Sequence, residues 1–206
     1  MNKKIIALMV IVGIIVIGVG IYWLQNQETA DQDTPIQENN DGEENSVDEN
    51  DSSIAIVYFS ATGNTKQVAE YIEEATGGTL FEIVPEEAYT QEDLNYSNDD
   101  SRASLEQNDP NARPEIANTI DLTSYEVIYF GYPIWWGDVP KIILSFLDEN
   151  DLSGKTVIPF CTSGSSGITT SIETLKEYRP NINWIDGARL TPSQSSVIDW
   201  INGLDI

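Results

Sequence analysis

Three short stretches of the sequence carry residues whose types and spacing suit the binding of a cofactor. The first consists of Ser60, Ala61, Thr62, Gly63, Asn64 and Thr65. A glycine lets the backbone approach an anion closely, and a helix that begins here would direct free N–H groups at that anion. Together with the hydroxyl groups, this predicts a site for a phosphate monoester. The alternative is an ordinary strand-to-helix turn with a serine or threonine cap.

Other phosphate-binding patterns are missing from the sequence around this turn. There is no Gly-x-x-x-x-Gly-Lys-Ser/Thr loop, and no Gly-x-Gly-x-x-Gly follows the apolar run before Ser60. A phospho-receiver site would need acidic residues at Ser60 and Ala61 and an aspartate near Gly131. The first stretch is therefore interpreted as a phosphate site without a lysine inside the loop.

The second stretch predicts a place for a flat aromatic ring. It contains Tyr132, Pro133, Ile134, Trp135, Trp136 and Gly137. Neighbouring side chains diverge, so two adjacent tryptophans suit a core poorly, and a planar ligand would give them a stacking partner. Gly137 could bring backbone groups close to ring nitrogens. The alternative places one tryptophan in the core and the other over a surface.

The third stretch follows Cys161 and again combines glycines with hydroxyl groups at the start of a predicted helix. It contains Thr162, Ser163, Gly164 and Gly167. Cys161 is the only cysteine of the chain, and histidine is absent. These counts exclude an intrachain disulfide, histidine metal sites and Ser-His-Asp or Cys-His catalysis. We therefore expect a bound cofactor to carry the chemistry, and we predict no catalytic residue and no metal site.

Alternating strands and helices must position these stretches. Apolar runs predict strands at residues 54–59, 79–84, 127–130, 156–160 and 182–185. Helices are predicted at residues 63–75, 139–150, 166–178 and 193–204. This alternation indicates an α/β fold with a doubly wound, five-stranded parallel sheet. We expect the strand order 2-1-3-4-5, in which ligands bind at the carboxyl ends of the strands, between strands one and three. All three stretches fall at such ends.

The predicted helix ends carry recognisable signals. Gly77 and Gly78 predict a stop for the first helix, and Asp138 and Ser193 predict N-caps. Residues 85–119 show no sustained period and contain three prolines. We therefore expect a long connection of the kind that often covers a site.

Taken together, the three stretches resemble the flavodoxin family, and most closely its short bacterial branch. The motifs that carry the likeness are Ser-x-Thr-Gly-Asn-Thr, Gly-Tyr-Pro-Ile-Trp-Trp-Gly and Phe-Cys-Thr-Ser-Gly. The resemblance spans about residues 54–204. It implies a flavodoxin-like domain at residues 54–206 that binds flavin mononucleotide (FMN).

The resemblance also implies roles for single residues. The first stretch, 60–65, would hold the FMN phosphate, residues 133–137 would cover the ring, and residues 162–164 would line its other edge. The long connection is similar to that branch at Tyr96, Arg102, Glu106 and Arg113. The two arginines either approach the ring or a partner, or form surface ion pairs. Cys161 is interpreted as a packing residue.

The N-terminal part of the chain has a different composition. Residues 5–24 carry no charged side chain, and Lys3 and Lys4 precede them. A helix of this length would be roughly 30 Å long, which is enough to cross a bilayer. We interpret residues 1–24 as a transmembrane anchor; the alternative is a cleaved signal peptide. The lysines favour a cytoplasmic N-terminus, which places the soluble domain outside the cytoplasm. Residues 25–53 are acidic and polar, which predicts a disordered linker.

Charge narrows the partners that we expect. The chain has 34 acidic and 10 basic residues; ten of the acids and two of the bases precede residue 54, which leaves 24 acids and 8 bases, a net −16, after it. Such a surface repels nucleic acid. The leading prediction is a membrane-tethered electron carrier that meets a redox partner protein or a quinone. The alternatives are an FMN-dependent NAD(P)H:quinone-type oxidoreductase and a tethered binding module without redox function.

Overall fold

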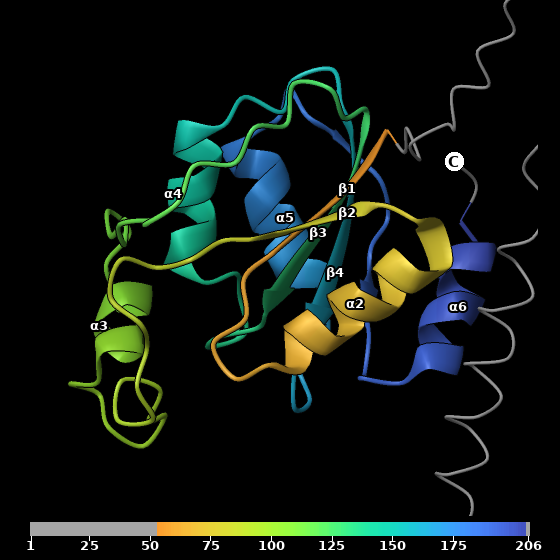
Figure 1. The fold of residues 1–206 in the computed structure, drawn as a ribbon. Helices are drawn as coiled ribbons and strands as arrows, with labels where there is room; N and C mark the ends of the chain where they lie inside the picture. The colour runs from red at the N-terminus through yellow and green to blue at the C-terminus, as the bar shows by residue number, and fades with distance from the viewer. Residues whose placement is uncertain (1–52, 205–206) are drawn as a thin grey trace, which may run out of the picture. The chain divides into compact units, whose positions relative to one another are not determined.

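A parallel β-sheet forms the centre of residues 53–204, the part of the chain that this computed structural model describes (Figure 1). Its strands are β1 (Ile54–Tyr58), β2 (Thr79–Glu82), β3 (Val127–Pro133), β4 (Thr156–Thr162), β5 (Asn183–Trp184) and β6 (Ala188–Arg189). They lie in the order β2-β1-β3-β4-β5, with β6 beside β4. The predicted order 2-1-3-4-5 is confirmed.

The anchor predicted at residues 1–24 lies outside the described residues, as does the predicted linker up to residue 52. None of the helices within residues 53–204 is long and apolar enough to cross a membrane.

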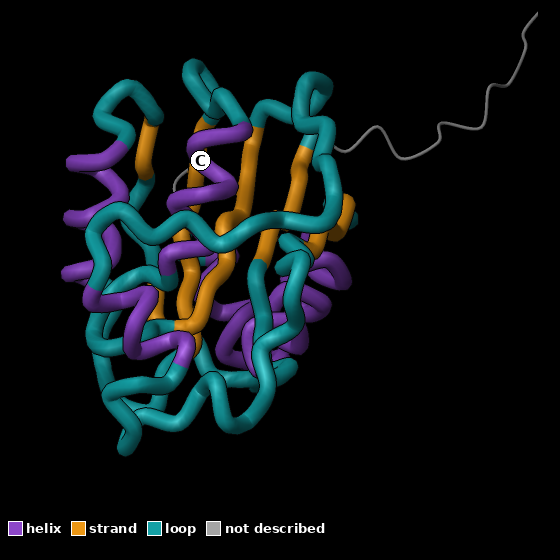
Figure 2. Tube along the Cα trace, turned by 90° about the vertical axis from the view of Figure 1, so that its left-hand side faces the viewer, coloured by secondary structure: helices purple, strands orange, loops and turns teal. Residues whose placement is uncertain are grey.

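Helices cover both faces of the sheet. Figure 2 shows the strands side by side, with helices on either side of them. The helices are α2 (Asn64–Thr76), α4 (Lys141–Glu149), α5 (Thr169–Tyr178) and α6 (Gln194–Asn202). On β3, Phe130 packs against Phe146 of α4, while its neighbour Tyr129 packs against Trp200 of α6. Alternate side chains of the strand therefore enter two separate cores. Full burial of one such side chain stabilises the fold by about 1.5–3 kcal/mol.

The edge of the sheet differs from the prediction. Instead of one strand at residues 182–185, two short strands, β5 and β6, both pair with β4. Between them the chain passes so close to β4 that a Cβ on Gly187 would lie 2.2 Å from the carbonyl oxygen of Pro159. Only glycine allows this approach, and the break separates the two pairings.

The helix ends agree with the sequence signals in part. Gly77 ends α2 in the left-handed conformation with φ 68°, and its N–H donates to the carbonyl of Glu73 at 2.8 Å. Ser193 is the N-cap of α6, although its hydroxyl makes no cap hydrogen bond. The prediction for Asp138 is wrong. Pro140 is the N-cap of α4, because the carboxylate of Asp138 accepts from the N–H of its own neighbour and from a threonine of α5.

Residues 85–119, hereafter the long connection, contain a helix that the sequence did not predict, α3 (Arg102–Asn108). With seven residues, α3 is too short to show a hydrophobic period. It buries Ala103 and Ser104, and the hydroxyls of Ser101 and Ser104 bond to each other at 2.8 Å. Figure 1 shows α3 apart from the helices that cover the sheet. Polar contacts therefore hold this helix where a larger apolar face would otherwise be needed.

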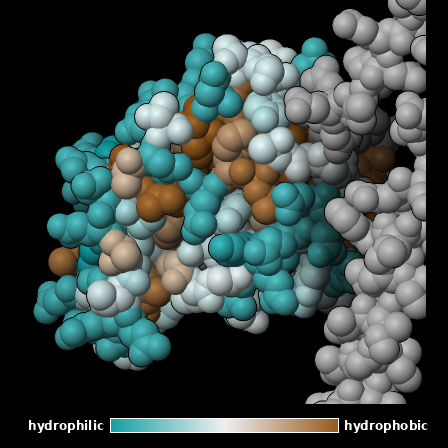
Figure 3. Space-filling model, viewed as in Figure 1, coloured by the Kyte–Doolittle hydropathy of each residue, from teal (hydrophilic) through white to brown (hydrophobic). Residues whose placement is uncertain are grey.

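The surface is largely hydrophilic on the face drawn in Figure 3, with apolar residues gathered towards its centre. This agrees with the excess of carboxylates in the sequence after residue 54.

Candidate functional site

The first stretch, residues 60–65, leads from β1 into α2 and leaves the helix N-terminus uncapped. Gly63 is the N-cap, with φ 87°, and no side chain caps the helix. The hydroxyl of Ser60 accepts the N–H of Gly63 at 3.1 Å, which shapes the turn. The first N–H groups of an α-helix have no partner within the helix and carry a partial positive charge. They are therefore available to an anion, as predicted for a phosphate monoester.

A buried hydroxyl pair joins the first stretch to the third. The side chains of Thr65 and Thr162 bond to each other at 2.8 Å, and both residues are almost fully buried. Thr65 belongs to the first turn of α2, and Thr162 ends β4. Either hydroxyl would be costly to bury without a hydrogen-bond partner. Moving the two loops apart would therefore destabilise the fold, and the pair holds them together.

The second stretch forms a tight turn at residues 135–138, hereafter the tryptophan turn. The backbone of Trp135 and that of Asp138 exchange two hydrogen bonds, of 2.9 and 3.0 Å. Trp136 has φ 49° and Gly137 has φ 84°. Positive φ at both central positions is the mark of a type I′ turn. Within residues 53–204, Trp136 is the only residue other than glycine with positive φ, so this turn holds backbone strain.

The two tryptophans point to different places. Trp135 is 4% exposed, and its ring meets those of Phe59 and Tyr89 edge to face, at 5.5 and 4.9 Å between centroids. Trp136 is 37% exposed, and its ring packs against that of Tyr96, in the long connection, with the ring centroids 4.4 Å apart. This is the alternative arrangement considered for the pair, with one ring in the core and one over the surface.

A pocket of about 450 Å³ lies where the three stretches meet at the carboxyl ends of β1, β3 and β4. Eight predicted site residues line it, namely Thr62, Asn64, Pro133, Ile134, Trp135, Thr162, Ser163 and Gly164. The remaining lining residues are Leu94, Tyr96, Leu190, Thr191 and Pro192. None of these side chains is charged, so the pocket offers neutral hydrogen-bond donors and apolar walls.

The other predicted site residues lie around this pocket and do not line it. Tyr132 is fully buried in the core, where its hydroxyl and that of Ser171 lie 3.1 Å apart. Burial raises the pKa of Tyr132 above its ordinary value, so this phenol stays protonated. Gly137 and Gly167 line a neighbouring polar hollow of about 330 Å³. Ser60, Ala61, Gly63, Thr65 and Trp136 belong to the turns that support the pocket.

Five lining residues were not predicted as part of the site. Leu94 and Tyr96 belong to the long connection, whose length was the main signal in the sequence that it covers a site. Leu190, Thr191 and Pro192 follow β6 and reach the pocket because β6 pairs with the end of β4. A sequence reading that missed β6 had no means of placing them.

Cys161 and the two arginines named above take structural roles. Cys161 is fully buried, and burial raises its pKa to about 12, which suits a packing residue and not a reactive thiolate. Arg102 pairs with Glu106 at 2.7 Å, and Arg113 pairs with Asp148 at 2.8 Å. Both arginines form ion pairs, as the second of the two alternatives expected. No cluster of acidic or cysteine side chains within residues 53–204 could hold a metal ion.

Comparison with known proteins identifies relatives of this chain. The flavodoxin family model matches residues 53–204. A crystal structure of a candidate flavoprotein from Bacteroides eggerthii is 41% identical, covers 74% of this chain and 98% of that one, and gives a TM-score of 0.70. A similar protein from Bacteroides uniformis is 42% identical, with coverage of 72% and 97% and a TM-score of 0.71.

A flavoprotein from Lactobacillus acidophilus, solved in complex with FMN, is 26% identical, with coverage of 72% and 97% and a TM-score of 0.54. A search of curated proteins found no match. The family match covers most of the chain and all of the sheet and loops described above. The chain therefore belongs to the flavodoxin family.

Proposed function

We propose that this chain is an FMN-binding, flavodoxin-like electron-transfer protein. The observation that carries the proposal is the meeting of three loops, from β1, β3 and β4, in one pocket at the carboxyl edge of the sheet. In open α/β sheets this edge, beside the point where the strand order reverses, is where cofactors bind. The complex of the Lactobacillus acidophilus relative with FMN supports the choice of cofactor.

The residues at the start of α2 fit the phosphate of FMN. The helix N-terminus has no side-chain cap, and the hydroxyl of Thr62 and the amide of Asn64 lie beside it, 3.2 Å apart. A Cβ on Gly63 would meet nothing within 4 Å, so the space beside this backbone is open. Backbone N–H groups and hydroxyls hold a phosphate without a cation, which suits a pocket that lacks charged residues.

The rest of the pocket fits a flat ring. Its volume of about 450 Å³ lies within the range usual for cofactor sites, roughly 300–1,000 Å³. Pro133 and Ile134 form one apolar wall, Tyr96 contributes an aromatic face, and Gly164 leaves open space beside it. FMN supplies one-electron and hydride chemistry when it is bound. The chain binds the cofactor, orients it and limits the access of water.

One observation favours a second candidate, an FMN-dependent NAD(P)H:quinone-type oxidoreductase. Leu94, Leu190 and Pro192 extend the pocket wall with apolar side chains beyond the three loops. Such a wall would suit an apolar acceptor such as a quinone. A carrier needs only an exposed ring edge, whereas an oxidoreductase needs room for a second substrate.

We further propose that the domain is tethered to the cell membrane by residues 1–24 and lies outside the cytoplasm. The uncharged run and the preceding lysines support this. The partner would then be a redox protein or a quinone at the membrane, with no role for nucleic acid, since the part of the chain after residue 54 carries a net −16. Fractionation of cells tests the tether. Recovery of the full-length chain in the soluble fraction would contradict it.

A reductive titration of the FMN-loaded chain distinguishes the two redox candidates. A carrier should be reduced in two separate one-electron steps and should show no sustained consumption of NADH or NADPH with a quinone. An oxidoreductase should turn over both substrates steadily. Reduction in a single two-electron step without turnover would contradict the carrier reading and leave the oxidoreductase without support.

A further inference from the structure

The long connection contacts the tryptophan turn at three separate points. Tyr89 meets the ring of Trp135 edge to face, with centroids 4.9 Å apart. Tyr96 packs against the ring of Trp136 at 4.4 Å. The side chain of Gln107 reaches the carbonyl of Trp135, in the backbone of the turn. The segment that the sequence left without structure therefore contacts both tryptophans and the peptide that joins them.

Gln107 binds the backbone on both sides of the turn. Its Nε2 donates to the carbonyl of Trp135 at 3.1 Å and to that of Val139 at 3.3 Å. The carbonyl of Trp135 also accepts the N–H of Asp138, at 3.0 Å, which closes the turn. This carbonyl belongs to the peptide that leads into Trp136, the residue with φ 49°. The amide of Gln107 thus adds a hydrogen bond from outside the turn to the carbonyl of the strained peptide.

The oxygen of the same amide, Oε1, helps to explain why a glutamine stands at this position. The Oε1 of Gln107 is buried and has no hydrogen-bond partner within the described residues. A buried acceptor without a donor destabilises a fold, and such atoms are rare. An apolar side chain of similar length would fill this place without that cost. The two hydrogen bonds from Nε2 account for the presence of a glutamine here.

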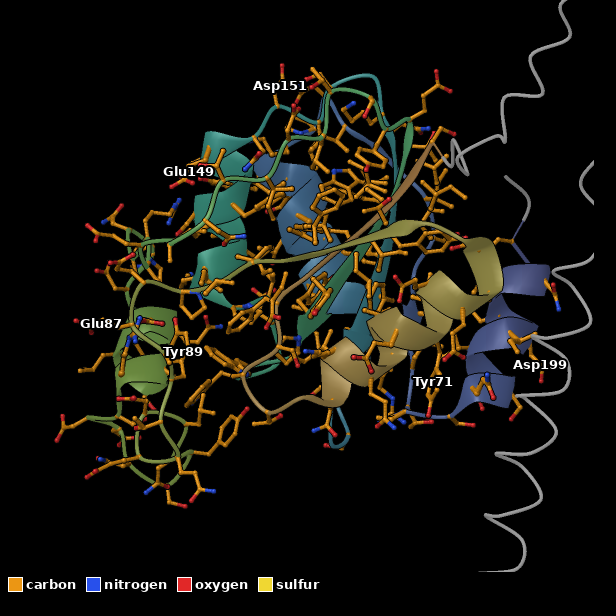
Figure 4. All side chains as sticks on the ribbon, viewed as in Figure 1. Tyr71, Glu87, Tyr89, Glu149, Asp151 and Asp199 are labelled. Carbon is orange, nitrogen blue, oxygen red and sulfur yellow. The ribbon has the colours of Figure 1, made fainter. Side chains whose placement is uncertain are left out.

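An ion pair and an aromatic ring hold α3, and therefore Gln107, in place. Arg102 pairs with Glu106 at 2.7 Å and lies 4.1 Å above the ring of Tyr89, whose hydroxyl donates to Glu106 at 2.6 Å. Burial, and next the bond to Glu106, raise the pKa of Tyr89, so its hydroxyl keeps the proton that it donates. Arg102 also donates to the carbonyl of Glu87 at 2.8 Å. Figure 4 labels Tyr89 and Glu87 beside α3.

We propose that Gln107 is a positioning residue of the cofactor site, through which the long connection holds the tryptophan turn against the bound flavin and sets its reduction potential. The inference rests on the proposed binding of FMN. The turn adjoins the pocket through Trp135, which lines it. A change in the orientation of the Trp135–Trp136 peptide changes which backbone dipoles face the ring, and backbone groups near the ring nitrogens tune a flavin.

The first test needs no cofactor and uses the full chain in its wild-type form and as three variants. Gln107→Leu removes both hydrogen bonds together with the unpaired oxygen, and Gln107→Met does the same with a longer side chain. Asn108→Leu, at an exposed position one residue along α3, is the matched control. We expect the N–H of Asp138 to exchange with deuterated water roughly tenfold faster in both Gln107 variants, and at the wild-type rate in Asn108→Leu. Unchanged exchange in both Gln107 variants would overturn the proposal.

The second test measures the reduction potentials of the FMN-loaded proteins. We expect at least one of the one-electron steps to shift in Gln107→Leu and Gln107→Met by about 59 mV, a tenfold change in its equilibrium constant. Thermal unfolding should stay close to that of the wild type, because the substitution also removes a buried unpaired oxygen. Wild-type potentials alongside faster exchange would overturn the link to the cofactor. If the wild-type chain takes up no FMN, the proposed function fails, and the exchange measurement alone decides whether Gln107 holds the turn.

Discussion

The uncapped start of α2 predicts that the chain distinguishes FMN from riboflavin, which lacks the phosphate. Hydrogen bonds to a charged group contribute about 1.5–3 kcal/mol each. The helix offers several free N–H groups beside the hydroxyl of Thr62. Even two such bonds supply at least about 3 kcal/mol, which corresponds to a ratio of dissociation constants of more than about 100.

The assay is a titration of each flavin with the chain, followed by quenching of flavin fluorescence. We expect Thr62→Ala to weaken FMN binding by about tenfold, because one hydroxyl donor is lost, and to leave riboflavin binding unchanged. Thr79→Ala, at an exposed position on β2, is the matched control and should bind both flavins as the wild type does.

Two results would refute this reasoning. Dissociation constants for FMN and riboflavin within about threefold of each other would show that the α2 terminus holds no phosphate. An equal loss of both flavins in Thr62→Ala would show that this hydroxyl supports the ring or the loop and does not bind the phosphate.

Three further predictions concern the scaffold. Gly187→Ala should lower the free energy of unfolding by more than about 2 kcal/mol in denaturant titrations, because the new Cβ would lie 2.2 Å from the carbonyl oxygen of Pro159; wild-type stability would show that the sheet edge shifts freely. Thr65→Val should cost about 1–3 kcal/mol by leaving the hydroxyl of Thr162 buried alone, and adding Thr162→Val should restore part of that loss; additive losses would argue against the pair. Burial raises the pKa of Asp148, but hydrogen bonds from a tyrosine and two arginines outweigh it and hold the pKa below its ordinary value. This carboxylate therefore stabilises the fold above its unfolded pKa of about 3.9, and the contribution disappears as pH falls through the lower folded pKa. Melting temperatures should accordingly fall less steeply on acidification in Asp148→Asn, and an unchanged slope would contradict the assignment.

The central part of the fold could be predicted because its signals are local. The apolar run before Ser60 is too short for a helix and too apolar for a loop, and it forms β1. Gly77 ends α2 because glycine adopts the left-handed conformation at little cost. The alternation of strands and helices predicted a parallel sheet, and the order 2-1-3-4-5, which goes with the flavodoxin resemblance, placed the three loops at one edge.

The missed features depend on contacts between distant residues. Helix α3 is stabilised by Ser101 and by the pairing of Arg102 with Glu106, and seven residues carry no periodic signal. Strand β6 can form because Gly187 lets the chain approach β4. No local sequence pattern predicts this approach. Asp138 has the residue type of a cap, yet its carboxylate binds a threonine of α5 instead.

The candidate site, too, could be predicted where its signals are local and not where it depends on distant residues. Residue types and spacing were sufficient to place Thr62 and Ser163 at one pocket. They did not decide how the adjacent tryptophans diverge, because the outcome depends on Tyr89 and Tyr96 from the long connection. A loop whose partners lie far away in the sequence can be recognised as functional before its geometry can be predicted.

The most direct test of the account is the visible absorption spectrum of the purified full chain after incubation with FMN and removal of free flavin. We expect a flavin band to remain with the protein. We expect it to be lost when Thr62 and Thr65 are both replaced by alanine, while the variant keeps its circular dichroism spectrum. A folded chain that comes through colourless would contradict the binding of FMN and, with it, both redox functions.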